Sequence, residues 1–118
     1  MKKIILLLAL AFSAFLAQAQ NAVTLKAGDT APDFKLKYID NKEVSFGTFK
    51  DAKGYIVVFT CNTCPYAVGY EQRIIDLDKK FRPQGYPVIA INPNDPEAST
   101  ADTFAKMQDL AKEKKYPF

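Results

Sequence analysis

The sequence predicts an α/β fold organised around a pair of parallel strands, and three segments carry this prediction. Residues 55–60 are an apolar run that ends in threonine, and residues 87–92 contain a second apolar run. Between them, apolar residues recur at spacings of three and four over residues 67–81, which is typical of one helix face. A strand, a helix and a second strand in this order form a parallel crossover. Because the first strand shows no alternation, we expect both of its faces to be buried.

Ahead of this unit, the sequence predicts a β-hairpin. Apolar and polar residues alternate over residues 34–38 and again over residues 43–46, as they do in half-buried strands. The Asp-Asn-Lys sequence at residues 40–42 is turn-forming. Residues 27–34 combine glycine, proline and aspartate, which indicates a further turn before the hairpin.

The helices have recognisable ends in the sequence. The first should end before Pro83, and we expect Tyr70 and Phe81 on its buried face. A final helix is predicted after the loop at residues 92–96. Its cap would be Ser99 or Thr100, and its first turn would contain Asp102 or Thr103. Four apolar residues would form its buried face: Phe104, Met107, Leu110 and Ala111.

Both cysteines lie where the first parallel strand gives way to the helix, in Cys61-Asn62-Thr63-Cys64-Pro65. A thiol attacks as the thiolate, and unpaired N–H groups at a helix start stabilise a thiolate. We expect Cys61 at or just before that start and Cys64 buried one turn later. A disulfide can close across this spacing, and Cys64 can attack a mixed disulfide at Cys61. The candidate catalytic residues are therefore Cys61 and Cys64, with a redox-active Cys61–Cys64 disulfide.

The flanking side chains are candidate site neighbours: Thr60, Asn62, Thr63, Pro65 and Tyr66. Pro65 suits the first helical turn, where its missing N–H costs little. Tyr66 and Phe59 are candidates for a shallow apolar rim that contacts substrate, and packing in the core is the alternative.

Two other interpretations of the cysteine pair stay open. One is a structural disulfide, although closing a loop of about four residues contributes only ~2 kcal/mol, against ~3 kcal/mol for about 15 residues. The other is a zinc site, but two cysteines in a chain without histidine cannot fill a tetrahedral N/S site by themselves. The strand–Cys-x-x-Cys–helix order favours redox chemistry. No metal and no cofactor is implied.

Residues 1–19 have the features of a signal peptide. Lys2 and Lys3 precede an uncharged stretch, and Ala17-Gln18-Ala19 matches the small-x-small cleavage pattern. An uncleaved membrane anchor is the alternative, but the apolar stretch is short for a spanning helix. Cleavage would lower the formal charge from +3 to +1, which weakens any case for nucleic-acid binding. We therefore expect an exported protein, periplasmic or secreted, without stable membrane association after cleavage, whose domain occupies residues 20–118.

The motifs Gly28-Asp29-x-Ala31-Pro32-Asp33-Phe34 and strand–Cys61-Asn62-Thr63-Cys64-Pro65 resemble the redoxin branch of the thioredoxin-like superfamily, which includes alkyl hydroperoxide reductase/thiol-specific antioxidant proteins. The resemblance covers about residues 23–118. It implies a thioredoxin-like fold, here incomplete at the C-terminus, in which Cys61 is the nucleophile and Cys64 the resolving thiol. Two features depart from relatives. The strand lacks the buried acid of thioredoxins, and the Pro-x-x-x-Thr-x-x-Cys motif of peroxiredoxins is absent.

The leading functional hypothesis is an exported thiol–disulfide oxidoreductase that acts on protein disulfides. Its partners would be protein thiol or disulfide substrates and an electron donor or acceptor, with no role for nucleic acid. The alternatives are a thiol peroxidase of peroxiredoxin-like type, in which Cys64 reacts with peroxide, and a non-catalytic module whose disulfide is structural.

Overall fold

The computed structural model describes residues 24–118, so the predicted signal peptide lies outside the described residues. The chain divides between Pro32 and Asp33 into two units, and each is described by itself. In the first unit, the Asp29 N–H donates to the Lys26 carbonyl (3.0 Å), and the Lys26 N–H donates to the Asp29 carboxylate (2.7 Å). Gly28 has a φ of 97°, which glycine adopts without a Cβ clash. The turn predicted in this segment is confirmed.

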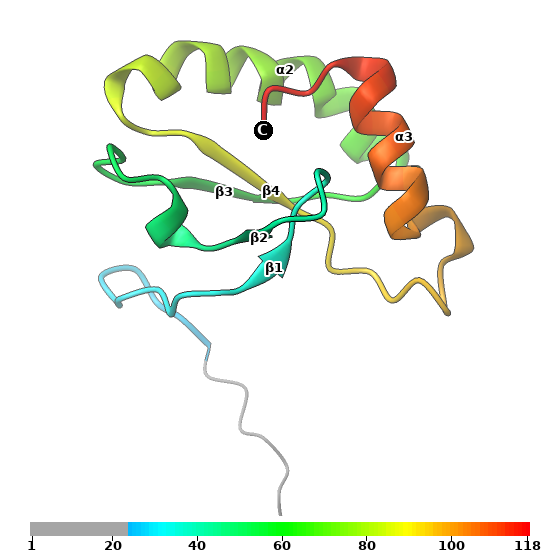
Figure 1. Ribbon diagram of the computed structural model, residues 1–118, viewed down its shortest axis with the longest axis horizontal. Helices are drawn as coiled ribbons and strands as arrows, with labels where there is room; N and C mark the ends of the chain where they lie inside the picture. Colours follow the sequence, from blue (N-terminus) through cyan, green and yellow to red (C-terminus); the bar gives the residue numbers. More distant parts are fainter. Residues whose placement is uncertain (1–23) are drawn as a thin grey trace, which may run out of the picture. The chain divides into compact units, whose positions relative to one another are not determined.

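The second unit, residues 33–118, contains two small sheets (Figure 1). Strands β1 (Leu36–Lys37) and β2 (Glu43–Val44) form an antiparallel hairpin in which Leu36 lies opposite Val44. Strands β3 (Ile56–Phe59) and β4 (Val88–Ile91) are parallel. The α/β fold, the hairpin and the parallel strand pair are confirmed as the sequence predicts them.

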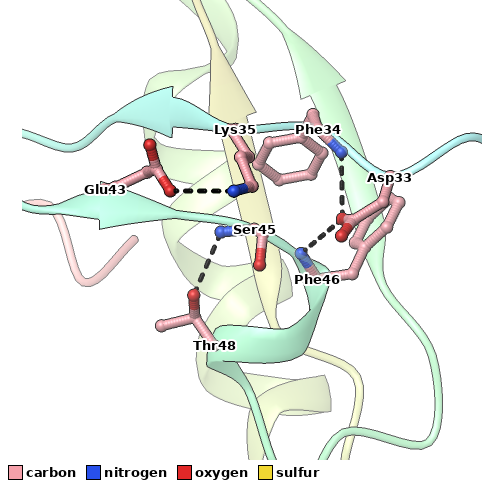
Figure 2. A network of polar contacts seen from close by, with 7 residues as sticks. All are labelled: Asp33, Phe34, Lys35, Glu43, Ser45, Phe46 and Thr48. Carbon is pink, nitrogen blue, oxygen red and sulfur yellow. Dashed lines mark hydrogen bonds and ion pairs between the residues drawn. The ribbon is translucent and has the colours of Figure 1, made fainter.

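Asp33, before the first strand of the hairpin, forms hydrogen bonds with the chain at both ends of the hairpin (Figure 2). The Asp33 carboxylate accepts hydrogen bonds from the N–H groups of Phe34 (2.9 Å) and Phe46 (3.0 Å). Phe46 begins the short 3-10 helix η1 (Phe46–Thr48). Its ring packs edge-on against the ring of Phe34, with the two ring centroids 4.8 Å apart. The last two residues of the Gly-Asp-x-Ala-Pro-Asp-Phe motif therefore have a structural role, which is to hold the hairpin closed.

Helix α2 (Pro65–Phe81) connects the two parallel strands and ends before Pro83, as predicted, with the 3-10 helix η2 (Arg82–Gln84) after it. Figure 1 shows it running along one side of the β3–β4 pair. Its Asp78 carboxylate accepts a hydrogen bond from the Val88 N–H (2.9 Å) and one from Arg82 Nε (2.7 Å). Asp78 and Val88 are each 1% exposed, so this link between helix and strand lies in the core.

The last helix begins later than the sequence predicts. Residues Thr100–Asp102 form the 3-10 helix η3, and α3 spans Phe104–Lys114. Thr103, not Ser99 or Thr100, caps α3, and its hydroxyl accepts from the Lys106 N–H at 3.4 Å. Asp102 consequently lies before α3 and not in its first turn. No helix within residues 24–118 is long and apolar enough to cross a membrane.

The prediction that β3 is buried on both faces is wrong. Its side chains alternate in exposure, with Val57 40% and Phe59 70% exposed. Within residues 24–118, β3 has β4 as its sole paired strand, and no element covers the face that carries these two residues. Tyr70, predicted to lie in the core, is 53% exposed, and the Arg73 guanidinium lies 4.9 Å from its ring.

Candidate active site

The cysteines follow the carboxyl end of β3, but their position relative to α2 differs from the prediction. Thr60 continues the strand pairing, because its N–H donates to the Ile91 carbonyl (2.9 Å). Cys61 comes directly after it, in the loop. Cys64 is the N-cap of α2, with Pro65 at the first helical position. The sequence predicts Cys61 at or just before the helix start and Cys64 inside the first turn; the helix begins at Pro65 instead, so Cys64 is the N-cap and Cys61 lies earlier in the loop.

Proline explains why the helix begins after Cys64. A proline at the first helical position loses no hydrogen bond, and its ring disfavours a helical conformation in the residue before it. Cys64 is extended accordingly, with φ −62° and ψ 126°. Its carbonyl accepts the first helical hydrogen bond, from the Val68 N–H at 3.0 Å. The Cys64 side chain therefore faces the unpaired N–H groups of the helix start.

The two thiols have opposite pKa shifts. The N–H groups of Ala67 and then Tyr66 stabilise the Cys64 thiolate and lower the pKa of Cys64, without a regular capping hydrogen bond. Burial is the main cause that raises the pKa of Cys61; the Cys64 N–H partly offsets it, and the Cys64 thiol adds to it. Both cysteines are free and half-buried in this structure. The more readily ionised sulfur is therefore Cys64.

An open hollow of about 560 Å³ gives access to both cysteines. Phe59, Tyr66 and Tyr70 contribute to its lining, and the side chain of Tyr66 is 83% exposed. Cys61 also borders a second cavity, of about 90 Å³, between β4, α2 and α3. Cys61 thus borders both the small cavity and the open hollow, whereas Cys64 borders the open hollow alone.

The predicted site neighbours divide into three groups. Thr60 lines both cavities, and Asn62 lines the small one. Tyr66 lines the open hollow. Thr63 and Pro65 are exposed and border neither cavity. Within residues 24–118, no group of three or more cysteine or acidic side chains could hold a metal ion.

Asp102 belongs to this site although the sequence did not predict it there. One of its carboxylate oxygens accepts hydrogen bonds from the Asn62 N–H (2.7 Å) and from Asn92 Nδ2 (3.0 Å). The other oxygen accepts from Ser99 Oγ (2.6 Å) and Asn94 Nδ2 (2.9 Å). The residue is 7% exposed. These four donors, led by the Ser99 hydroxyl and the Asn62 N–H, hold the pKa of Asp102 far below its usual range.

A signal for this network was present in the sequence. The loop at residues 92–96 follows β4, so its amides lie at the same sheet edge as the cysteines. An acidic side chain close to those amides in the fold would accept their hydrogen bonds and form a polar cluster with them. The acid itself had no distinguishing local pattern, because an aspartate near a helix start is common as a dipole-stabilising residue.

Solved structures show the same fold. The chain is similar to a hypothetical protein from Sinorhizobium meliloti 1021, with 31% identity and a TM-score of 0.73 over 83% of this chain and 52% of that one. An uncharacterized conserved protein from Geobacillus kaustophilus has 32% identity and a TM-score of 0.73, over 80% of this chain and 51% of that one. The solution structure of a protein described provisionally as a thioredoxin, from Neisseria meningitidis, has 22% identity and a TM-score of 0.57, over 75% of this chain and 54% of that one.

The chain thus spans about half the length of each of these solved structures. No curated protein matches it. The model of the AhpC/TSA family matches residues 27–118, which is most of the chain. This match supports a thiol-based redox function, and the neighbours show a thioredoxin-like fold. The chain therefore belongs to the AhpC/TSA family, in the redoxin branch of the thioredoxin-like superfamily.

Proposed function

We propose that the chain carries the dithiol site of an exported thiol–disulfide oxidoreductase that acts on protein disulfides. The observation that carries this proposal is the placement of two free cysteines at the strand–helix junction, both open to one hollow. An exchange site needs a thiolate, a second thiol within reach and room for a bulky partner, and these features supply all three.

The exchange would proceed in two steps. First, the Cys61 sulfur attacks one sulfur of the substrate disulfide, so that a mixed disulfide forms and one substrate thiolate leaves. Second, the Cys64 sulfur attacks Cys61 in the mixed disulfide, which closes the Cys61–Cys64 disulfide and releases the other substrate thiol. Two electrons pass from the dithiol to the substrate. A dithiol electron donor would regenerate the pair, and the reverse sequence would oxidise a substrate.

The order of attack rests on how the two thiols interact. The lower pKa of Cys64 makes it the ionised sulfur of the reduced pair, and Cys61 lies beside it with a raised pKa. We retain Cys61 as the attacking sulfur, as the family resemblance implies, because an ionised Cys64 beside it can take up its proton as the attack proceeds.

A second candidate function is a thiol peroxidase, and the lowered pKa of Cys64 favours it. In that reaction the Cys64 thiolate attacks one peroxide oxygen, the O–O bond breaks, and an alcohol or water leaves as Cys64 becomes a sulfenic acid. Cys61 would then attack the sulfenic sulfur, which closes the disulfide and releases water. The acceptor, a peroxide or a protein disulfide, is what separates the two candidates.

The proposed compartment is the periplasm or the exterior, after removal of residues 1–19. An oxidising compartment suits a disulfide substrate, and continued turnover there needs an electron donor or acceptor partner. The mass of the chain recovered from the exporting cell tests this point. A chain that begins at Gln20 supports export with cleavage, and a chain that retains residues 1–19 contradicts it.

The test of function compares the chain with Cys61→Ser, Cys64→Ser and the double serine variant. Dithiothreitol-driven reduction of insulin disulfides should fall to the level of the double variant in both single variants. Cys64→Ser should trap mixed disulfides with insulin at alkaline pH, where Cys61 ionises without help, and Cys61→Ser should trap few. If instead peroxide is consumed, Cys61→Ser still forms a sulfenic acid and insulin is untouched, the peroxidase candidate replaces the proposal.

A further inference from the structure

Asp102 is a buried carboxylate whose hydrogen bonds reach the loop between the two cysteines. It comes from η3, far along the sequence from Cys61 and Cys64, and is 7% exposed. Within the described part of the chain, no lysine or arginine forms an ion pair with it. Burying a charge is costly unless hydrogen bonds replace its water, and four donors do so here.

Two contacts fix the loop itself. The Asn62 N–H donates to the Asp102 carboxylate at 2.7 Å, and Asn62 Nδ2 donates to the Ala101 carbonyl at 2.9 Å. Residue 62 is therefore held through both its backbone and its side chain by η3. A loop held at its second residue has little freedom to change the direction in which Cys61 points.

We infer that Asp102 is a positioning residue of the dithiol site: its carboxylate fixes the Cys61–Cys64 loop and places a fixed negative charge beside both sulfurs. The inference deepens the proposed function and rests on it. A negative charge at this place opposes ionisation of a neighbouring thiol, and Asp102 does raise the pKa of both cysteines, as a smaller cause than burial at Cys61 and than the helix N–H groups at Cys64. Asp102 thus restrains the thiolate that the helix start promotes.

The other groups that face the cysteines do not repeat this arrangement. Among the described residues that line the open hollow, none has an acidic or basic side chain. The small cavity beside Cys61 has one acid, one base and two tyrosines in its lining: Glu71, Lys37, Tyr38 and Tyr116. Asp102 is among the main causes that shift the pKa of Cys61, and Glu71 and Lys37 are not.

Asp102→Asn separates the charge of Asp102 from its shape. The new amide oxygen can keep the hydrogen bonds from the Asn62 N–H and from Asn92. Its NH₂ group would then face the Ser99 hydroxyl, which can rotate to accept, and the Asn94 amide, which can flip to present its oxygen. Asp78→Asn is the matched control, because Asp78 is equally buried but binds Val88 and Arg82 and borders neither cavity of the cysteines.

The experiment measures alkylation rate against pH for each cysteine, in the Cys61→Ser and Cys64→Ser backgrounds, with and without these substitutions. Asp102→Asn should lower the pKa of both thiols. A drop of about half a unit raises the thiolate fraction roughly threefold below the pKa, and the lower nucleophilicity reduces the gain to about twofold in rate. Asp78→Asn should leave both profiles in place. Unchanged profiles in folded Asp102→Asn would overturn the inference.

A second measurement does not depend on the variant folding. In the unsubstituted chain, the Asn62 amide should exchange with solvent hydrogen far more slowly than the exposed Thr63 amide beside it. Equal exchange of the two amides would contradict the positioning role. Both readouts report on the loop and not on turnover. A chain that shows them but fails to reduce insulin would disprove the proposed function and leave the role of Asp102 intact.

Discussion

Two buried carboxylates lie at opposite ends of β4, and the fold stabilises them in different ways. Asp78 meets the first residue of the strand, Val88, and forms an ion pair with Arg82. Asp102 meets Asn92, which directly follows the strand, and binds only uncharged donors. Asp78 is stabilised by the positive charge of Arg82, whereas Asp102 is stabilised by four hydrogen bonds from uncharged groups.

The difference assigns different tasks to the two ends of the strand. An ion pair with the partly exposed Arg82 offsets the charge of Asp78, and the hydrogen bond of Asp78 to Val88 ties α2 to β4. Neutral donors stabilise Asp102 without cancelling its charge, and this charge still acts on Cys61 and Cys64. The contact at the amino end of β4 thus has a structural role, and the contact at the carboxyl end belongs to the candidate active site.

Truncation of the two acids should give the largest effect. Asp102→Ala leaves four donors without their acceptor and should lower the free energy of unfolding by about 2–4 kcal/mol. Asp78→Ala should cost less, about 1–3 kcal/mol, because Val88 loses a buried acceptor while the 40% exposed Arg82 side chain can turn to water. Urea denaturation of the reduced proteins, with the slope checked for constancy, measures both. A larger loss in Asp78→Ala would contradict the comparison.

The second prediction concerns the acid dependence of stability. The pKa of Asp102 is lower in the folded chain than in the unfolded one, where it lies near 3.9. Its stabilising contribution is therefore complete above about pH 5 and is lost as the pH falls below about 4 toward the folded pKa. The stability difference between the chain and Asp102→Asn, which does not titrate there, should shrink from about pH 6 to about pH 3. A difference that stays constant with pH would show that Asp102 is not held as a carboxylate.

The smallest effect is expected at the cap of α3, the helix that follows Asp102. Thr103→Ala removes the cap and should lower the free energy of unfolding by about 0.5–1 kcal/mol, at the low end because the bond is long, 3.4 Å. Thr100→Ala is the control and should change stability little, since the Thr100 contact with Lys106 is made by its backbone carbonyl. A loss in Thr100→Ala with none in Thr103→Ala would place the helix start where the sequence predicts it.

Periodicity and turn chemistry were enough to predict most of this fold. The apolar run at residues 55–60, the helical spacing that follows and the second run at residues 87–92 correspond to β3, α2 and β4. These signals are local, so the sequence displays them directly. The cysteine pair likewise located the site, because its position between strand and helix follows from those same patterns.

The remaining features depend on distant contacts. Burial of β3 depends on what lies against it, and the composition of Val57 and Phe59 could not show that one face stays exposed. The helix begins at Pro65, as its fit to the first turn predicts, but Cys64 lies at the N-cap and not inside the first turn because Pro65 restrains the residue before it. Asp102 belongs to the site because its carboxylate accepts a hydrogen bond from the Asn62 N–H, and no sequence spacing predicts a contact between residues 62 and 102.

The central claim is that Cys61 and Cys64 act as one redox pair, and a single stoichiometric reaction tests it most directly. The reduced chain is mixed with one equivalent of a disulfide substrate, and the intact mass, the alkylation of each cysteine and the released substrate thiols are measured. The chain should lose two hydrogen atoms, digestion should locate a Cys61–Cys64 disulfide, and substrate thiol should appear in matching amount. Two cysteines that both remain open to alkylation, with the substrate disulfide intact, would contradict the claim.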